Sequence, residues 1–295
     1  MPKPVNSPGN AVWQRLQNEV IAAGLCTHCG ACAGLSAGQV VMQQTGRGPL
    51  PVSVGKAVDL DESVWAACPG KGVDYPGLNR RVFGKLPQNW LSGCIRRIYV
   101  GYAAPEAVRR AGASGGVITQ TLLYLLETGQ IDGAVVVQAG RPLPYLAEPV
   151  IATTPAQILA GAQSVYQPVP VNDILGEMVG FNGRLAYVGL PDQVASLREL
   201  QRQGHPGAMK VEYVLGPYVG TNMYLEAIAS YLRANGVNSL DEIAALKYRD
   251  GEWPGYLMIR LKDGRVLKRQ SFITTTSSPS TSAKAACSPW ISPTN

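Results

Sequence analysis

Regularly spaced cysteines are the strongest chemical feature of this sequence. Cys26, Cys29 and Cys32 lie in the stretch GLCTHCGACAG, with two residues between neighbours. A C-x2-C-x2-C run opens the bacterial ferredoxin motif, whose fourth cysteine precedes a proline. Cys68 in AACPG has that proline, so the four thiols predict a single 4Fe–4S cluster. Structural zinc and free thiols are the alternatives, although zinc favours two separated cysteine pairs or a mixture of cysteine and histidine.

Cys94 and His28 are not expected to be ligands of the cluster. Cys94 has no partner at ligand spacing, so we expect a core residue there. His28 stands between two predicted ligands, and we expect it to face solvent. The chain begins without the apolar stretch of a secretory signal, so its six cysteines indicate metal or redox chemistry rather than disulfides.

A glycine-rich turn is the second candidate site. Ser114, Gly115 and Gly116 in GASGGVITQTLL stand at the start of a predicted helix. The unpaired N–H groups of a helix N-terminus attract anions, and glycines allow a phosphate to approach the backbone. The turn matches neither GxGxxG nor a P-loop, so an ordinary helix start capped by Ser114 is the alternative.

The elements that position these residues are distributed unevenly. Residues 1–90 are predicted to be irregular apart from a helix at 11–24, and a bound cluster would organise this ferredoxin-like segment. Beyond it, helices alternate with strands, which predicts an α/β fold with a mainly parallel sheet and flanking helices. Strands are predicted at 96–103, 132–139, 183–190 and 210–216, helices at 114–129, 155–163, 191–204 and 221–237, and a hairpin at Asp263-Gly264.

Composition narrows the class of protein further. The chain is 46% hydrophobic with no run long enough to span a membrane, so we expect a cytoplasmic protein. The net charge is +6, but the arginine pairs are scattered without interleaved aromatics, so nucleic-acid binding is not expected. A mildly basic surface suits an acidic redox partner or an anionic cofactor.

A set of motifs in order resembles one family. The stretches are LCTHCGACAG, AACPG, RAGASGGVITQTLLYLLETGQIDGAVVV, AGAQSVYQPVP and LAYVGLPDQVASLREL. From about residue 24 to 272 the chain resembles the beta subunits of coenzyme F420-reducing hydrogenase and related dehydrogenases. The resemblance implies an oxidoreductase that passes electrons between a 4Fe–4S cluster and FAD and exchanges hydride with coenzyme F420 or a related acceptor. It also implies a redox partner protein, either ferredoxin or a hydrogenase or dehydrogenase subunit.

The resemblance also assigns roles to residues. It implies that the FAD pyrophosphate lies at 114–116 and that Ser164 and Tyr166 lie near the flavin, while no catalytic residue is assigned. Asp192 in GLPDQ stands where relatives commonly carry cysteine, and Tyr218 in GPYVG stands where a second is often found. These departures predict that the chain carries one cluster only. We expect Asp192 to cap the helix that follows it.

These inferences divide the chain into four parts. They are a cluster-binding segment (1–90), a flavin-binding α/β region (91–180), a second α/β region (181–272) and a low-complexity tail (273–295). Two explanations of the tail are open, a disordered end or a frameshift after about Phe272. Two other functions are open as well, a ferredoxin-dependent flavin reductase acting on another substrate and a non-catalytic iron–sulfur scaffold.

Overall fold

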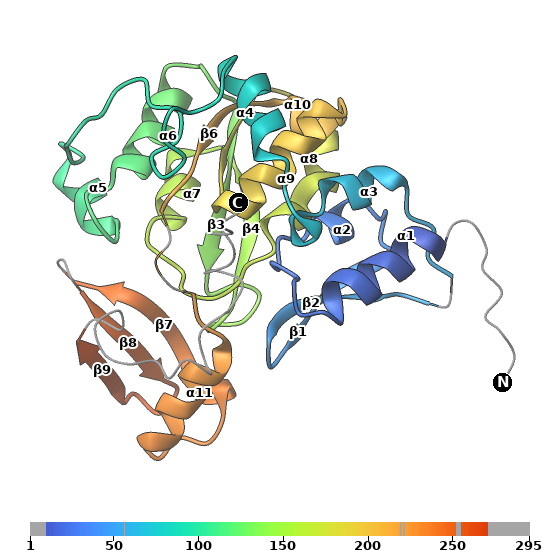
Figure 1. The fold of residues 1–295 in the computed structure, drawn as a ribbon. Coiled ribbons are helices and arrows are strands. Elements are labelled where there is room, and N and C mark those ends of the chain that lie inside the picture. Colours follow the sequence, from blue (N-terminus) through green and yellow to red (C-terminus); the bar gives the residue numbers. More distant parts are fainter. Residues whose placement is uncertain (1–9, 56, 219, 221, 252–254, 271–295) are drawn as a thin grey trace, which may run out of the picture.

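Three units are visible in the computed structural model, which describes residues 10–270 except 56, 219, 221 and 252–254. A central sheet with helices on both faces carries an N-terminal unit on one side and a C-terminal antiparallel sheet on another (Figure 1). The predicted low-complexity tail and its Cys287 lie outside the described residues.

The N-terminal unit contains more regular structure than predicted. Its elements are α1 (Asn10–Arg15), the π-helical turn η1 (Leu16–Ile21), α2 (Ala31–Gly34), β1 (Val40–Thr45), β2 (Gly48–Ser53), α3 (Glu62–Ala67), the 3-10 turn η2 (Pro69–Lys71) and α4 (Tyr75–Phe83). β1 and β2 pair as an antiparallel hairpin, and Trp13, Leu16 and Val64 contribute to a core of their own. The expectation of an irregular segment is therefore wrong. Two prolines in β2 concealed the hairpin, because proline argues against a strand.

The central sheet is mixed rather than mainly parallel. Its strands are β3 (Gly133–Ala139), β4 (Ala147–Ala152), β5 (Leu185–Val188) and β6 (Val211–Leu215), in the order β4-β3-β5-β6. β3, β5 and β6 are parallel, whereas β4 is antiparallel to β3, and the other two sheets are antiparallel throughout. The short connection from β3 to β4 explains the correction, because a parallel neighbour needs a long crossover.

Helices cover both faces of this sheet. They are α5 (Glu106–Ala111), α6 (Val117–Glu127), α7 (Pro155–Ala160), the 3-10 turn η3 (Val171–Ile174), α8 (Leu175–Gly180), α9 (Pro191–Arg202) and α10 (Pro206–Met209). Val135 of β3 joins one core with residues of α8 and α9, whereas Val136 joins another with residues of α6 and α7. This alternation is the period of a strand buried on both faces. The predicted helices at 114–129 and 191–204 are confirmed by α6 and α9.

The C-terminal unit has its own small core. Its elements are α11 (Leu225–Ala234), the 3-10 turn η4 (Leu240–Glu242), β7 (Ile243–Asp250), β8 (Tyr256–Leu261) and β9 (Val266–Gln270). α11 packs on the antiparallel sheet through Ile228 and Leu232. The predicted hairpin is confirmed, and Gly264 has a φ of +90° at the turn between β8 and β9. Within the described ranges no helix combines the length and the apolar character needed to cross a membrane.

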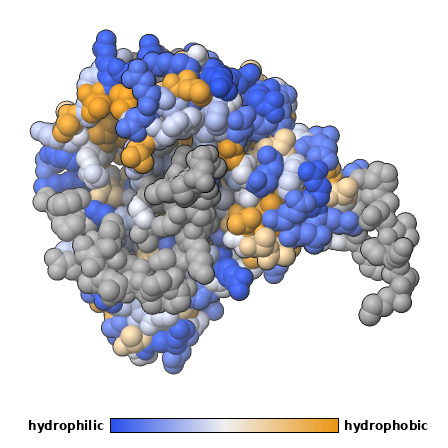
Figure 2. Space-filling view, in the orientation of Figure 1, coloured by the Kyte–Doolittle hydropathy of each residue, from blue (hydrophilic) through white to orange (hydrophobic). Residues whose placement is uncertain are grey.

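The strand predicted at 96–103 is wrong. No strand of the described ranges pairs with it, and Ile98, Tyr99 and Val100 are 78%, 78% and 102% exposed. The end of the stretch is held by a 2.7 Å bond from the N–H of Ala103 to the carbonyl of Gly115 and by the guanidinium of Arg109, which lies 5.0 Å from the ring centroid of Tyr102. Hydrophobic side chains are correspondingly visible on the surface beside α5 and α6 (Figure 2). The stretch is apolar, but a strand also requires a hydrogen-bonding neighbour.

Candidate functional site: a cavity beside a cysteine loop

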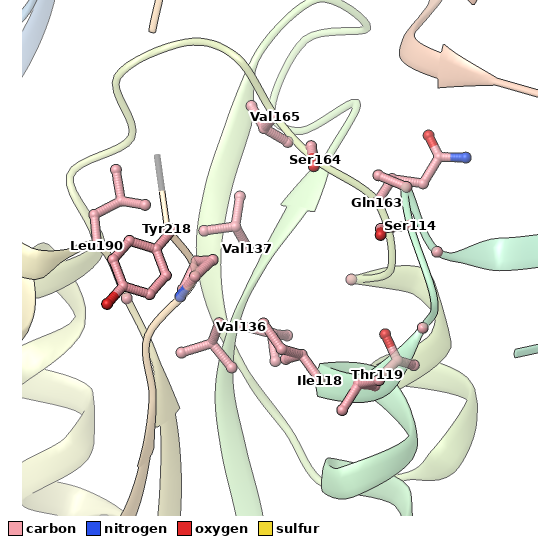
Figure 3. A pocket seen from close by; sticks show the side chains of 18 of the residues that line it. Ser114, Ile118, Thr119, Val136, Val137, Gln163, Ser164, Val165, Leu190 and Tyr218 are labelled. Carbon is pink, nitrogen blue, oxygen red and sulfur yellow. The ribbon is translucent and has the colours of Figure 1, made fainter. Parts of the chain in front are cut away.

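A cavity of about 680 Å³ opens where the parallel strands β3, β5 and β6 end. Val137 and Val188 line it from β3 and β5, and Tyr218 lines it beyond β6. Ser114 and Ser164 lie on one side, whereas Leu190 and Tyr218 lie on the other (Figure 3). Open α/β sheets bind ligands outside the carboxyl ends of their strands, and this volume is typical of a cofactor or small-molecule site.

All the residues that the resemblance assigned to the flavin line this cavity. They are Ser114, Gly115, Gly116, Ser164 and Tyr166. The glycine-rich turn that carries residues 114–116 and the 163–167 segment are far apart in the sequence. They meet because both pass the same end of the sheet. The structure therefore places the predicted residues in one site, and their binding role stays a prediction.

The glycine-rich turn opens α6 directly onto the cavity. Gly116 is the N-cap at a φ of +71°, and no side chain caps the helix, so the alternative that Ser114 caps it is wrong. A Cβ added to Gly116 would lie 2.8 Å from the carbonyl oxygen of Val108. A Cβ on Gly112 would lie 2.9 Å from the Cα of Gly116. The glycines thus let the turn close on itself, which leaves the first N–H groups of α6 to bind other partners.

Two lining residues had no sequence signal. Gln163 has a φ of +104°, which is rare for a residue other than glycine and marks local backbone strain beside Ser164. Gln193 is buried and uses its side chain twice, accepting from the N–H of Leu190 at 2.9 Å and donating to the carbonyl of Val169 at 2.9 Å. The bond to Leu190 is the one that a glutamine at the third helical position typically makes, whereas the strain at Gln163 and the bond to Val169 follow from neither residue type nor spacing.

The four predicted cluster thiols lie close together in the N-terminal unit. Cys29 is buried. Cys26, Cys32 and Cys68 are half-buried, and all three pack against the core of the N-terminal unit. Burial raises the pKa of Cys26, Cys29 and Cys32, and the nearby Cys68 raises all three further. In the part of the chain that the structure describes, no three His, Cys, Asp or Glu side chains are arranged to hold a single metal ion.

Glycine makes this gathering of thiols sterically feasible. A Cβ on Gly70 would lie 2.7 Å from the carbonyl oxygen of Leu25, where the Cys68 turn meets the Cys26 loop. A Cβ on Gly30, at a φ of +86°, would lie 2.7 Å from the N atom of Asp173 in η3. In both cases the atom that the added Cβ would meet belongs to the backbone of the neighbouring segment. Any larger residue would therefore push the two segments apart.

Burial controls the protonation of the cysteines. It raises the pKa of Cys26 to about 11, and it raises the pKa of Cys68 as well. Backbone N–H groups oppose this effect, from His28 at Cys26 and from Gly70 and Lys71 at Cys68. The thiols are thus protonated at neutral pH, and a bound metal would have to displace their protons, with these N–H groups stabilising the thiolates.

His28 is a buried anchor, which corrects the expectation that it faces solvent. Its side chain is 5% exposed, and its Nδ1 lies 2.8 Å from the carbonyl oxygen of Pro49 in β2. Its ring meets that of Tyr224 edge-on, with centroids 6.1 Å apart. Burial lowers the pKa of His28, which favours the neutral imidazole with a proton on Nδ1. His28 therefore ties the cysteine loop to the hairpin.

Asp192 does not cap α9 in the expected way. The N-cap is Leu190, followed by Pro191 at the first helical position, which suits proline. Asp192 instead lies one residue inside the helix and close to Cys26 and Cys29. Burial raises its pKa, although the Thr27 hydroxyl and the N–H groups of the first turn oppose that shift. The Thr27 hydroxyl nevertheless makes no hydrogen bond of normal geometry.

A single layer of chain separates the cysteine loop from the cavity. The N–H of Asn172 in η3 donates to the carbonyl of Cys29 at 2.8 Å, and its side-chain amide donates to the carbonyl of Gln193 at 3.3 Å. Gln193, Val169 and Val171 all line the cavity. Cys29 packs in the same core as both valines. The two candidate sites therefore share one wall.

Replacing Asn172 by alanine is expected to destabilise this wall. Asn172 is fully buried and accepts a 2.7 Å bond from the hydroxyl of Tyr187, which is also fully buried. Loss of the acceptor leaves a buried hydroxyl unsatisfied, so the free energy of unfolding in urea should fall by about 1–3 kcal/mol. Tyr187→Phe and the double variant complete a thermodynamic cycle. Strictly additive effects would show that the bond contributes nothing.

Fold and sites together define an α/β protein that has a cavity of cofactor size at the strand ends and a cysteine-rich N-terminal unit. Residues 98–176 match the model of the coenzyme F420 hydrogenase/dehydrogenase beta subunit N-terminal region, and 182–287 match that of its C terminus. The chain belongs to the coenzyme F420 hydrogenase/dehydrogenase beta subunit family. Hydrogenases and dehydrogenases are oxidoreductases, so the chemistry of the family is redox chemistry.

Two curated proteins are similar to this chain. A coenzyme F420-dependent sulfite reductase of Methanocaldococcus jannaschii is 27% identical over 240 residues, which are 75% of this chain and 34% of that protein. A coenzyme F420 hydrogenase subunit beta of Methanothermobacter thermautotrophicus is 25% identical over 147 residues, 48% of this chain and 51% of that protein. The chain thus spans between a third and about half of these relatives.

A solved structure is also similar. It is the F420-reducing [NiFe] hydrogenase complex from Methanosarcina barkeri, one chain of which aligns with a TM-score of 0.45 and 23% identity. The alignment covers 59% of this chain and 63% of that chain.

Proposed function

We propose that this chain is an F420-linked oxidoreductase component that holds FAD in the cavity and one 4Fe–4S cluster on Cys26, Cys29, Cys32 and Cys68. The observation that carries the proposal is the shared wall, in which Asn172 and Gln193 connect the cysteine loop to the cavity by hydrogen bonds. Two redox groups on either side of one layer of chain would be close enough to exchange electrons. The curated relatives that are named for coenzyme F420 support the choice of hydride partner.

The residues of the cavity fit a dinucleotide. The uncapped start of α6 offers N–H groups to a pyrophosphate, and the turn 112–116 keeps side chains away from it. Val136 of β3 and Val188 of β5, which pack in the same core, supply an apolar surface suited to a flat ring, with hydroxyls of Ser114 and Ser164 at its edge. A flavin, when bound, supplies the conversion between hydride transfer and single-electron transfer.

The cysteine loop supplies the four thiols that a 4Fe–4S cluster requires. The thiols of a 4Fe–4S site bind four different irons, so they stand further apart than the ligands of one zinc. The N–H groups that face Cys26 and Cys68 would stabilise the negative charge of bound sulfur. Lys71 adds a positive charge beside Cys68. A redox partner protein, either ferredoxin or a hydrogenase or dehydrogenase subunit, would exchange electrons at this unit.

Anaerobic purification followed by iron, flavin and zinc analysis tests this function. We expect about one FAD and about four irons per chain, and reduction of F420 when the protein is given an electron donor. Ferredoxin should be tried as the donor, with the reverse reaction from reduced F420 as the second direction. Iron without flavin would favour a scaffold, and zinc without iron would favour a binding module. Flavin and iron without any F420 reaction would favour a reductase of another substrate.

A further inference from the structure

A buried arginine reaches the wall of the cavity from the C-terminal unit. Arg249 of β7 is 8% exposed. Its Nη1 donates to the hydroxyl of Tyr166 at 2.9 Å, and its Nη2 donates to the carbonyl of Ala113 at 3.1 Å. Both partners line the cavity. The Nε of Arg249 is buried and has no hydrogen-bond partner among the described residues.

In the part of the chain that the structure describes, no residue neutralises the charge of Arg249. Within the described ranges no carboxylate forms an ion pair with it, and its two partners are neutral oxygens. The neighbouring Asp250 pairs with Lys247 and Lys268 instead. A buried cation without a counter-charge is strongly unfavourable, and proteins normally pair such a group. An anion is therefore expected close to this guanidinium.

Two independent features place that anion at the same end of the cavity. Ala113 belongs to the glycine-rich turn that precedes helix α6. The positive N-terminal end of α6 faces the cavity and has no capping side chain. The bond to Arg249 also orients this turn. The carbonyl of residue 113 and the N–H of Ser114 belong to one planar peptide and point in opposite directions. Holding the carbonyl against the guanidinium therefore directs the Ser114 N–H away from it, toward other partners.

We propose that Arg249 is a positioning residue for a phosphate or pyrophosphate ester bound at the glycine-rich turn. It supplies the positive charge behind the cavity wall and holds Tyr166 and the 113–114 peptide in place. This inference rests on the proposed function, in which the ester is the pyrophosphate of FAD. It adds that the C-terminal unit selects phosphorylated flavins over riboflavin, which has the same ring system but no phosphate.

Titrations of the apoprotein with FAD and with riboflavin test the proposal. In Arg249→Met the Kd for FAD should rise about ten- to hundredfold, the range for loss of an interaction with a charged group. The Kd for riboflavin should change little, because riboflavin lacks the group that the charge positions. Arg249→Lys should restore part of the FAD affinity. Arg260→Met, which removes an exposed cation from the adjacent strand β8, should leave both constants unchanged.

Equal weakening of FAD and riboflavin would show that Arg249 only maintains the fold, and no weakening of FAD would show that it plays no part. If Arg249→Met does not fold, the same comparison is made with Arg249→Lys and Arg249→Gln. Inorganic pyrophosphate is a probe that lacks the flavin. It should raise the Tm of the wild-type apoprotein but not that of the Arg249 variants. Wild-type protein that binds pyrophosphate but no flavin would overturn the proposed function alone. Wild-type protein that binds FAD with no effect of the Arg249 variants would overturn this inference alone.

Discussion

Replacing Cys29 by serine is expected to abolish iron binding and to loosen the N-terminal unit. Cys29 is the most buried of the four predicted ligands, so no solvent molecule can easily take the place of its sulfur. A hydroxyl is a far weaker ligand for iron than a thiolate. Iron should fall from about four per chain to nearly none. Because metal binding and local folding are coupled, residues 24–72 should also become more sensitive to protease.

Cys94→Ser is the matched control for this experiment. Cys94 is half-buried, contrary to the expected core position, and its Sγ lies 3.6 Å from Oδ1 of Asn79 in α4. Its replacement should leave iron and visible absorbance unchanged. Cys68→Ser should behave like Cys29→Ser if Cys68 is the fourth ligand. Full iron content in Cys68→Ser would exclude it from the ligand set and leave the C-x2-C-x2-C run without the proposed partner.

Replacing Gly116 by alanine is expected to weaken FAD binding by at least about tenfold, which corresponds to about 1.4 kcal/mol. Two effects add at this position. The φ of +71° disfavours any residue with a Cβ, and the new Cβ would lie only 2.8 Å from the carbonyl oxygen of Val108. Since that oxygen belongs to the backbone, the turn must shift. The shift would misplace the N–H groups at the start of α6 that are proposed to bind the pyrophosphate.

Gly129 provides a control at the other end of the same helix. Its φ is +65°, but nothing lies within 4 Å of an added Cβ. Gly129→Ala should therefore lower the Tm through backbone strain alone and keep the affinity for FAD. The measurement is the Kd for FAD in each variant, determined at a temperature where both are folded. Equal affinities in Gly116→Ala and Gly129→Ala would contradict a binding role for the turn.

Local patterns in the sequence predicted the elements that depend on local chemistry. The helix α6 between Gly116 and Gly129, the buried strand β3 and the hairpin at Gly264 follow from periodicity and from residues that tolerate positive φ. The motif order also led to the correct family. Predictions failed where a partner strand decided the outcome. β1 and β2 pair despite the prolines of β2, whereas the apolar stretch 96–103 has no described partner.

Residue types and spacing are enough to identify the groups available for chemistry: four cysteines at cluster spacing and a glycine-rich helix start. How these groups lie relative to one another depends on the packing of the fold. Arg249 reaches Ala113 across 136 positions of the chain, and Asn172 joins Cys29 to the wall of the cavity. Spacing in the sequence cannot encode such contacts, because they arise from the packing of whole units against one another. The burial of His28 and the placement of Asp192 beside the cysteines have the same origin.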